Sequence, residues 1–255
     1  MTVSGSPFGR SLRHWRRLRG VSQLELAGLA ETTTRHVSYL ETGRARPSQR
    51  MVSRLADALQ VPLRERNGLL ERAGLSPLYP EGDLAADDDL APFGQAIARL
   101  LASHEPYPGF VVDRGWNIVS ANEGAERFLA GITERNSARL VLGPLQDLIE
   151  NWREVTYALL SRLSADLVQF PDDPDLLELH AEVRDALGDI RRLQLPTTGR
   201  VVLPRFRIGG TVVRTITVAA RFESVTDVAL DEVRIELVYP ADADSGQFFR
   251  DLAAE

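Results

Sequence analysis

The stretch Val21–Pro47, VSQLELAGLAETTTRHVSYLETGRARP, decides how the first third of the chain folds. Ser22 is a favourable N-cap residue, and Glu25, which follows it by three positions, completes a capping-box pattern. Apolar residues then recur at helical spacing, which predicts a short helix from this point. These residues are Leu24, Ala27 and Ala30.

A second helical pattern follows almost directly. The polar run 31–36 separates the two patterns, and Val37 and Leu40 supply the apolar side of the second helix. Gly43 should end that helix, because glycine readily takes the left-handed conformation of a helix C-terminus. Two helices joined by a tight turn form the arrangement that places the second helix in the DNA major groove. The residues on its outward side are Thr34, Arg35, His36 and Tyr39.

Further helical patterns flank this pair. The stretch GRSLRHWRRLR over 9–19 predicts a preceding helix, Ser48 should cap a fourth helix, and residues 63–74 predict a fifth. We therefore expect an all-α, five-helix domain over 9–75, after a flexible lead at 1–8.

The pattern changes beyond a linker expected over 76–91, which is rich in proline, glycine and acidic residues. Within it, the acidic run 87–89 indicates a solvated segment rather than a metal site, because consecutive side chains point in different directions. Residues 92–255 predict an α+β domain with an antiparallel sheet and helices on one face of it. Helices are predicted over 93–104, 122–130 and 175–187, and a long helix is predicted within 145–170. Strands are predicted over 109–113, 116–121, 200–208, 211–222 and 228–239.

Composition limits the class of protein. The chain has 255 residues, of which 44% are apolar, and it has no cysteine. Disulfides, thiolate catalysis and cysteine-based zinc sites are therefore excluded, and the composition fits a cytoplasmic protein. No apolar run is long enough for a membrane span, and the first ten residues lack the layout of a secretory signal.

Charge is divided unevenly along the chain. Residues 1–80 hold 13 arginines and 6 acidic residues, whereas residues 81–255 hold 17 arginines and 30 acidic residues. The net charge of the whole chain is -6. A basic first third nevertheless suits a module that binds phosphates.

Residues 9–74 resemble the Xre-type helix-turn-helix family, the five-helix module of lambdoid phage repressors. The resemblance implies a lambda-repressor-like domain that binds a specific DNA sequence. The chain departs from the family pattern at the turn, where Glu31 and Thr32 stand in place of the usual glycine and apolar residue. If Glu31 takes a positive φ, the strain is about 1–2 kcal/mol. The positions that match are Gln23, Ala27, Val37, the Leu40-Glu41-X-Gly43 ending and Pro47-Ser48.

The second domain resembles the MmyB-like ligand-binding domain, a PAS-like module of actinobacterial regulators. The matching strings are PYPGFVVDRGWNIVSANEGAERFL at 106–129, NSARL at 136–140, Asn151-Trp152, and DVALDEVRIELVYPAD at 227–242. The resemblance implies that this domain binds a small lipophilic molecule, such as a fatty acid, and modulates operator binding in response.

We expect DNA contacts from the helix pair and the residues just after it. Gln23 opens the first helix and should face a phosphate. Arg35 is the expected base-reading residue because its fork matches guanine O6 and N7, with a phosphate contact as the alternative. The set is completed by Thr33, which should mainly cap the reading helix, by Thr34, His36 and Tyr39 on it, and by Arg44 and Arg46 beyond it.

Candidate ligand contacts in the second domain are aromatic residues and two polar ones, and each has a structural alternative. Asn122 follows a strand and opens a helix, which is typical of an N-cap residue. Arg139 can pair with a ligand carboxylate or with an acidic residue of the protein. An aromatic residue can pack in a core as well as line an apolar pocket. The set is Phe110, Trp116, Asn122, Arg139, Trp152, Phe206 and Phe222.

The sequence gives little indication of catalysis. The chain has 4 histidines, and it contains no G-x-S-x-G, H-E-x-x-H, Walker or G-x-G-x-x-G motif. We expect no enzymatic activity, no metal and no cofactor.

The sequence thus predicts a transcription regulator whose second domain senses a small lipophilic molecule. One reading helix covers only a half-site, so we expect a homodimer on a double-stranded operator. The alternative is a DNA-binding protein whose second domain contacts another protein, as in an antitoxin or a scaffold. A lined cavity on the order of several hundred cubic ångströms favours the sensor, and a filled, polar interior favours the alternative.

Overall fold

The computed structural model describes residues 6–84, 86–188, 202–223 and 225–254. By their contacts they form two compact units. The first comprises Met1–Gly82 and Ser224–Asp231, and the second comprises Asp83–Glu223 and Glu232–Glu255. None of the helices formed by the described residues is long and apolar enough to cross a bilayer.

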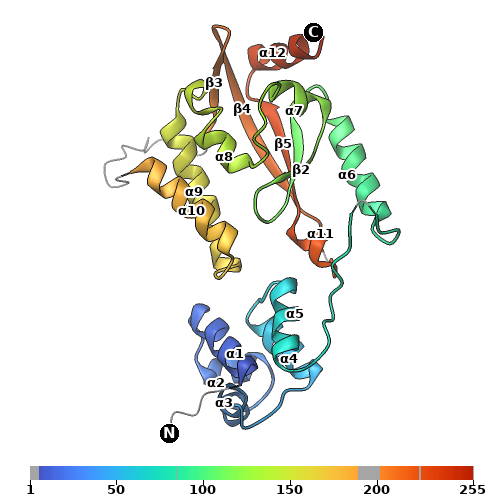
Figure 1. Ribbon diagram of the computed structural model, residues 1–255, viewed down its shortest axis with the longest axis vertical. Coiled ribbons are helices and arrows are strands. Elements are labelled where there is room, and N and C mark those ends of the chain that lie inside the picture. The colour runs from blue at the N-terminus through green and yellow to red at the C-terminus, as the bar shows by residue number, and fades with distance from the viewer. Residues whose placement is uncertain (1–5, 85, 189–201, 224, 255) are drawn as a thin grey trace. The chain divides into compact units, whose positions relative to one another are not determined.

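The first unit contains five short helices, which confirms the all-α fold expected for it (Figure 1). Serine and threonine caps start four of them: Ser6, Ser22, Thr33 and Ser48 each accept a hydrogen bond from the backbone N–H three residues ahead. The helices are α1 (Pro7–Leu18), α2 (Gln23–Leu29), α3 (Thr34–Thr42), α4 (Gln49–Ala58) and α5 (Leu63–Arg72).

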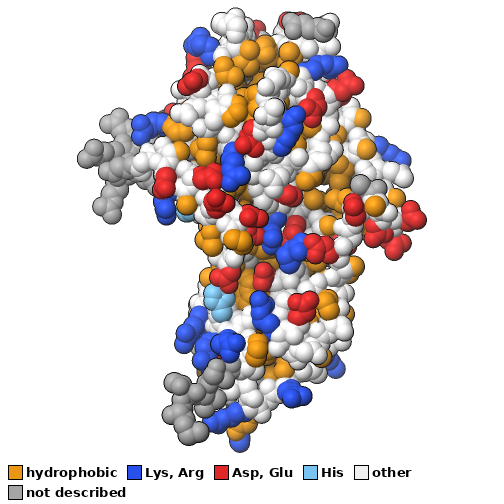
Figure 2. Space-filling model, in the orientation of Figure 1, with side chains coloured by type: hydrophobic (Ala, Val, Ile, Leu, Met, Phe, Trp, Pro, Cys, Tyr) orange, Lys and Arg blue, Asp and Glu red, His pale blue; other side chains and the backbone are white. Residues whose placement is uncertain are grey.

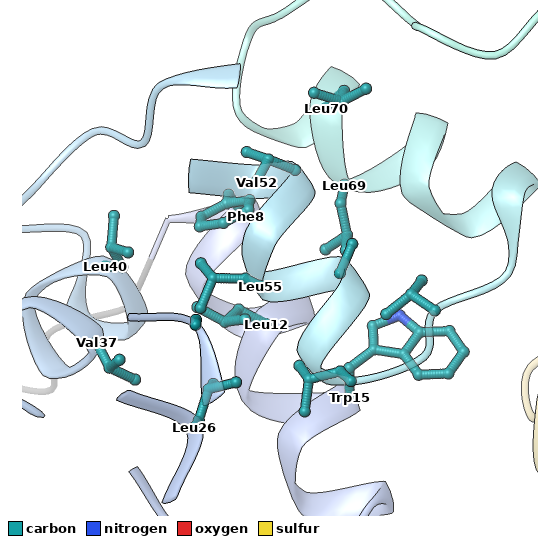
Figure 3. Close-up of a cluster of buried hydrophobic side chains, with 14 of the residues drawn as sticks. Phe8, Leu12, Trp15, Leu26, Val37, Leu40, Val52, Leu55, Leu69 and Leu70 are labelled. Carbon is teal, nitrogen blue, oxygen red and sulfur yellow. The ribbon is translucent and has the colours of Figure 1, made fainter. Parts of the chain in front are cut away.

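Apolar side chains from all five helices meet in one core (Figure 3). Leu12, Val37 and Leu40 are completely buried in it. Phe8 is also buried, and α1 begins at Pro7. The expectation of a flexible lead over 1–8 is therefore wrong at its end, because burial of the Phe8 ring stabilises the first turn of the helix.

The helices α1 and α3 approach each other closely at Gly9. A β-carbon added at Gly9 would lie 2.5 Å from the carbonyl oxygen of Glu41 and 2.6 Å from that of Leu40. Any larger residue would force the two helices apart. The backbone of α1 therefore rests directly on the C-terminal part of α3.

The turn between α2 and α3 contains a strained residue. Glu31 has a φ of 48°, in the left-handed region that favours glycine. The next amide, of Thr32, donates to the carbonyl of Ala27 at 2.8 Å and closes the turn. Glu31 thus takes the positive φ that the sequence pattern suggested, at a cost of about 1–2 kcal/mol of strain.

The second unit is built on a five-stranded sheet in which every neighbouring pair is antiparallel, as expected. The strand order is β2-β1-β5-β4-β3, so the last strand in the sequence lies at the centre of the sheet. The turn at Gly209-Gly210 joins β3 to β4, as expected. The strands are β1 (Gly109–Val112), β2 (Ile118–Ala121), β3 (Arg205–Ile208), β4 (Thr211–Ala220) and β5 (Arg234–Pro240).

Helices lie on both faces of this sheet, so the expectation of helices on one face is wrong (Figure 1). On one face, α6 (Ala91–Ser103) packs Ile97 and Leu101 against Ile235 and Leu237 of β5. On the other face lie α7 (Glu123–Phe128), α8 (Ser137–Leu142), the 3-10 helix η1 (Gln146–Leu148) and α9 (Trp152–Gln169). The helix α10 (Pro174–Leu187) packs on α9, and α12 (Ala243–Ala254) packs Phe249 into the core beside α7.

The long helix expected within 145–170 is α9, and the short η1 precedes it. Two predicted strands differ from the structure. The strand expected over 228–239 begins only at Arg234, because residues before it form the helix α11 (Val228–Glu232). The strand expected over 200–208 corresponds to β3, which begins only at Arg205. Positions 200–201 lie outside the described residues. The helix α12 was not predicted.

The segment Ser224–Asp231 returns to the first unit, although it lies far along the sequence. The amide of Val228 donates to the carbonyl of Pro80 at 2.8 Å, and the amide of Gly82 donates to Oδ2 of Asp227 at 2.9 Å. The other oxygen of Asp227 accepts from the amides of Ala229 and Leu230 and caps α11. Asp227 thus joins this helix to the end of the first unit.

We predict that Glu31→Gly stabilises the first unit by about 0.5–1 kcal/mol, because relief of the strain at positive φ exceeds the conformational entropy that glycine loses on folding. Glu31 also pairs with Arg54, but its side chain is 75% exposed, so losing the pair should cost little. Amide hydrogen exchange of α2 and α3 in the full chain measures the effect. Glu31→Gln, which keeps the strain, is the control; lower protection in Glu31→Gly than in this control would contradict the account.

Candidate functional site

The outward side of α3 is open to solvent in the first unit. Thr34 and Arg35 are exposed, and His36 and Tyr39 are half-buried. Thr33 caps the helix through its side chain, and Gly43 ends it with a φ of 75°. The face of α3 proposed to contact DNA is therefore accessible, and Val37, Leu40 and Glu41 form the opposite, buried face.

Two arginines stack on one tyrosine on this outward side. The guanidinium of Arg35 lies 5.1 Å from the ring centre of Tyr39, and that of Arg44 lies 5.9 Å from it. Arg35 also donates from Nε to the Tyr39 hydroxyl at 2.9 Å. Stacking restricts both guanidiniums, and both arginines are exposed residues. Arg46 is exposed two residues further on, and Figure 2 shows arginine side chains spread over the surface of this unit.

The buried side of α3 carries a carboxylate that joins three helices. The Glu41 side chain is completely buried and accepts from Arg13 and Arg16 of α1, at 3.1 and 2.6 Å between Nε and the carboxylate. It also accepts from the side-chain amide of Gln23, on α2, at 2.8 Å. Gln23, which we expected to face a phosphate, therefore directs a side-chain N–H inward.

Burial alone would raise the pKa of the Glu41 carboxyl group. Hydrogen bonds from Arg16, Gln23 and Arg13, together with the charge of Arg16, outweigh that effect, and the pKa of Glu41 is lowered. The same hydrogen bond to Glu41 raises the pKa of Arg16. The pair is thus held in its charged form inside the unit.

The second unit encloses a cavity of about 370 Å³ between the sheet and the helices α7, α8 and α9. Its floor follows the strand register: Phe110, Glu236 and Ala219 are direct neighbours across β1, β5 and β4, and all three line the cavity. Thr217 and Val238 form the next neighbouring pair of the floor. Strand alternation thus gives one face of β4 and β5 to the cavity.

Mostly apolar side chains cover the floor. They come from α7, α8, the segment before η1, α9 and β3, and include Phe128, Leu129, Leu140, Leu145, Leu159 and Phe206. The polar exceptions from these elements are Ser137 and Arg162. A cavity of this size lies within the range of about 300–1,000 Å³ that is usual for small-molecule sites.

Three of the residues predicted for the ligand line this cavity: Phe110, Trp116 and Phe206. Trp116 has a φ of 66°, a strained conformation that the surrounding structure must maintain. Its indole N–H donates to Asp166 at 2.9 Å, which fixes the orientation of the ring.

The other four predicted residues do not line the cavity. Asn122 is buried as the N-cap of α7, and its side chain bonds to four backbone groups. Arg139 pairs with Glu182 at 2.7 Å, so the structural alternative holds. Trp152 donates to the carbonyl of Val141 at 2.7 Å, and Phe222 packs edge-on against Phe93.

Sequence reasoning missed the two charged residues of the cavity wall, Arg162 and Glu236. A signal existed for Glu236: Arg234 and Glu236 are charged residues two apart in the otherwise apolar stretch RIELV. Such spacing in a strand places both side chains on the same face. No comparable signal marked Arg162, which lies 74 positions from its partner Glu236.

The described residues offer no cluster of three His, Cys, Asp or Glu side chains that could hold a metal ion. Comparisons with known families match both units. A helix-turn-helix domain family matches residues 7–69, and the family described as MmyB-like transcription regulator ligand binding domain matches residues 93–252. A search of curated proteins gave no match.

The fold and the matched families define a transcription regulator that joins a DNA-binding domain to a ligand-binding domain. The chain belongs to the MmyB-like transcription regulators, and both resemblances seen in the sequence are confirmed.

We predict that Glu41 contributes stability in a defined pH window. Its pKa is lower in the folded chain than the ordinary value of 4.5, so its contribution is complete above that pH and declines as the pH falls through the folded-state pKa. Denaturant unfolding of the wild type and of Glu41→Gln at several pH values measures it. The difference in unfolding free energy between the wild type and Glu41→Gln should shrink on acidification. When both chains also carry Arg16→Gln, this difference should be smaller at every pH. A difference that is independent of pH would contradict this role.

Proposed function

We propose that this regulator binds operator DNA through α3 and is controlled by a small lipophilic molecule held in the cavity of the second unit. The observation that carries the proposal is the cavity itself, about 370 Å³ and mostly apolar, inside the domain that follows the DNA-binding domain. An interior of this kind favours a sensor over a protein that contacts only other proteins. A fatty-acid-like molecule suits the apolar walls.

On the DNA side, we assign the contact with base edges to Arg35. Thr34, His36 and Tyr39, on the same side of α3, supply neighbouring polar groups for further contacts with the DNA. Arg35 is exposed and already oriented by Tyr39. Arg44 and Arg46 follow the helix end and suit contacts with the phosphate backbone. Thr33 and Gln23 act mainly through structure, as the cap of α3 and as a donor to Glu41.

A homodimer follows from the size of the reading surface. One helix of nine residues spans a half-site, so specific binding requires two copies on an inverted repeat, with half-sites about one helical turn apart. The ligand would act by favouring one placement of the two reading helices, which it can do only through different affinities for the competing placements. The segment Ser224–Asp231 supports such coupling, because it bonds to the first unit and leads along the chain into β5, which lines the cavity.

We predict that Arg35→Ala relaxes preference at one operator position and weakens specific binding by about 1–3 kcal/mol, because the guanidinium matches two acceptors of guanine. Binding of the full chain to operator variants, each changed at one base pair, measures this loss. Unchanged selectivity in the variant would contradict base reading by Arg35.

The matched contrast is Arg44→Ala, which removes the other arginine stacked on Tyr39. This change should weaken binding to all sequences equally and lower the salt dependence by about one phosphate contact. Unequal losses among operators would show that Arg44 reads bases and would overturn its assignment.

We predict that Ala158→Phe reduces the affinity for lipophilic ligands by about tenfold or more, because Ala158 on α9 lines the cavity and a larger ring occupies its volume. Titration of the full chain with medium-chain lipids, followed by calorimetry, measures the change. Native mass spectrometry of the purified chain should also show a bound lipophile in the wild type and less in the variant.

The control for this variant is Ala98→Phe, which adds the same ring at an exposed position of α6 outside the cavity. It should bind as the wild type does. If a broad set of lipids binds to neither the wild type nor the control, the cavity is not a lipophile site, and the interaction-module alternative gains support.

A further inference from the structure

The outer edge of β4 is only partly covered by its neighbour in the sheet. β4 has 10 residues and β3 has 4, so the two strands pair over residues 211–214 alone (Figure 1). The amide of Thr215 donates to the carbonyl of Pro204 at 3.1 Å and extends this cover by one residue. In the part of the chain that the structure describes, no strand pairs with residues 216–220 on that side.

Strand alternation identifies the backbone groups that this edge presents. The amide of Thr215 points away from β5, and residues 215–220 pair with β5 in an unbroken register. Every second residue therefore has the same orientation, so the amides and carbonyls of Thr217 and Ala219 also point away from β5. These groups pair with no described residue. The edge thus presents two residues whose donors and acceptors are available to a further strand.

The side chains on this stretch are exposed on both faces of the strand. Residues 216–219 are four consecutive exposed positions, and Ile216 and Val218 are 38% and 46% exposed. A strand covered on one face would instead alternate between buried and exposed positions. The stretch TITVAA at 215–220 also lacks charged residues and proline, which commonly keep an edge strand from pairing. This edge is therefore well suited to pair with another strand.

We propose that residues 216–220 of β4 pair with the same residues of a second copy of this chain, antiparallel about a two-fold axis at Val218. The proposal rests on the proposed function, because it supplies the interface of the homodimer inferred there. In this register Thr217 lies opposite Ala219 of the partner subunit, and the two exchange a pair of hydrogen bonds. The symmetry repeats this exchange on the other side of the axis.

The backbone groups favour this register over its neighbours. A pairing centred on Thr217 would place Ala219 opposite Thr215 of the partner subunit, whose amide is already bonded to Pro204. A pairing centred on Ala219 would place Thr217 opposite Arg221 of the partner subunit, beyond the end of β4. Only the register centred on Val218 uses the outward groups of both Thr217 and Ala219 within the strand.

The charges at the ends of the stretch are compatible with two copies. Arg214 pairs with Asp242 at 3.1 Å, and Arg221 lies 3.8 Å from Asp166, so each arginine is compensated within its own chain. In the proposed register neither arginine lies opposite an arginine of the partner subunit, so no like charges are paired directly. At the axis, Val218 meets its own copy at a position without hydrogen bonds, where side chains approach most closely.

The two residues that make the proposed hydrogen bonds also line the cavity. The cavity wall includes Thr217 and Ala219 but not Val218. Pairing of two β4 strands would therefore join the cavity floor of one copy to that of the other. A molecule that shifts β4 when it occupies the cavity changes the interface, and this connects ligand binding to the placement of the two reading helices.

Sedimentation velocity of the full chain without DNA tests the interface, at concentrations from about 1 to 100 µM. The wild type should dimerise within this range, because one pair of short strands forms a small interface. A wild type that stays monomeric would overturn the proposal and leave this edge to a strand of another protein. That result would leave DNA reading and ligand sensing intact, since two copies can still meet on an operator.

Two charge variants test the position of the axis. Val218→Lys and Val218→Glu each place like charges opposite each other, so each should weaken the dimer by about tenfold or more. The Val218 side chain is partly exposed, so both variants should keep the fold, which thermal unfolding checks. An equimolar mixture of the two should restore the dimer to near its wild-type strength, because lysine then faces glutamate. Absence of this rescue would overturn the pairing of Val218 with its own copy.

The matched control is Val119→Lys on β2, the strand at the opposite edge of the sheet. Val119 is 57% exposed, so the same substitution is made at a similarly accessible valine. This variant should dimerise as the wild type does, and loss of its dimer would move the interface to β2 and overturn the proposal.

A further variant decides the question if Val218→Lys unfolds. Ala219→Pro removes an amide that points away from β5, so it leaves the bonds between β4 and β5 in place. It should weaken the dimer by about tenfold, because the amide is lost from both copies. An unchanged dimer in this variant would contradict pairing through β4.

Discussion

The Glu41 carboxylate joins the three helices on which DNA reading depends. It lies on α3, Arg13 and Arg16 of α1 and Gln23 of α2 donate to it, and its side chain is completely buried. Removing one partner of such a buried pair costs about 3–5 kcal/mol, so the position of α3 is tied to the other two helices. The exposed side of α3, with Arg35 stacked on Tyr39, is presented in one orientation as a result.

The central strand β5 organises the second unit, because its successive side chains point to opposite faces of the sheet. Ile235 and Leu237 pack against α6, while Arg234, Glu236 and Val238 point to the opposite face. One short strand thus supplies an apolar anchor on one side and a charged cavity wall on the other. A strand with charged residues can be central here because each charge has a partner: Glu236 with Arg162 and Arg234, and Arg234 with Asp166 as well.

Local signals were readable from the sequence, and long-range pairings were not. The caps at Ser22 and Thr33 and the strained turn at Glu31 depend on a few neighbouring residues, so their patterns were sufficient. The contacts of Glu41 join positions up to 28 residues apart, and Arg162 and Glu236 are 74 apart. The helix α11 is an exception, because its signal is local: Asp227 directly precedes it and caps it through the amides of Ala229 and Leu230, yet the alternating pattern of the following residues was interpreted as a strand. The two family resemblances therefore identified the class of protein, and the geometry identified the cavity.

Neither unit is a continuous piece of polypeptide, because the segment Ser224–Asp231 belongs to the first unit while its neighbours on both sides belong to the second. A fragment that stops at Gly82 would lack the carboxylate of Asp227, and a fragment that starts at Asp83 would carry Asp227 without the amide it accepts from. If the N-terminal domain were exchanged between related regulators, the transplanted domain would therefore lack residues 227–228, which bond to Pro80 and Gly82. A functional chimera would have to restore the bonds made by Pro80 and Gly82, which makes residues 227–228 a constraint on how the two domains can be recombined.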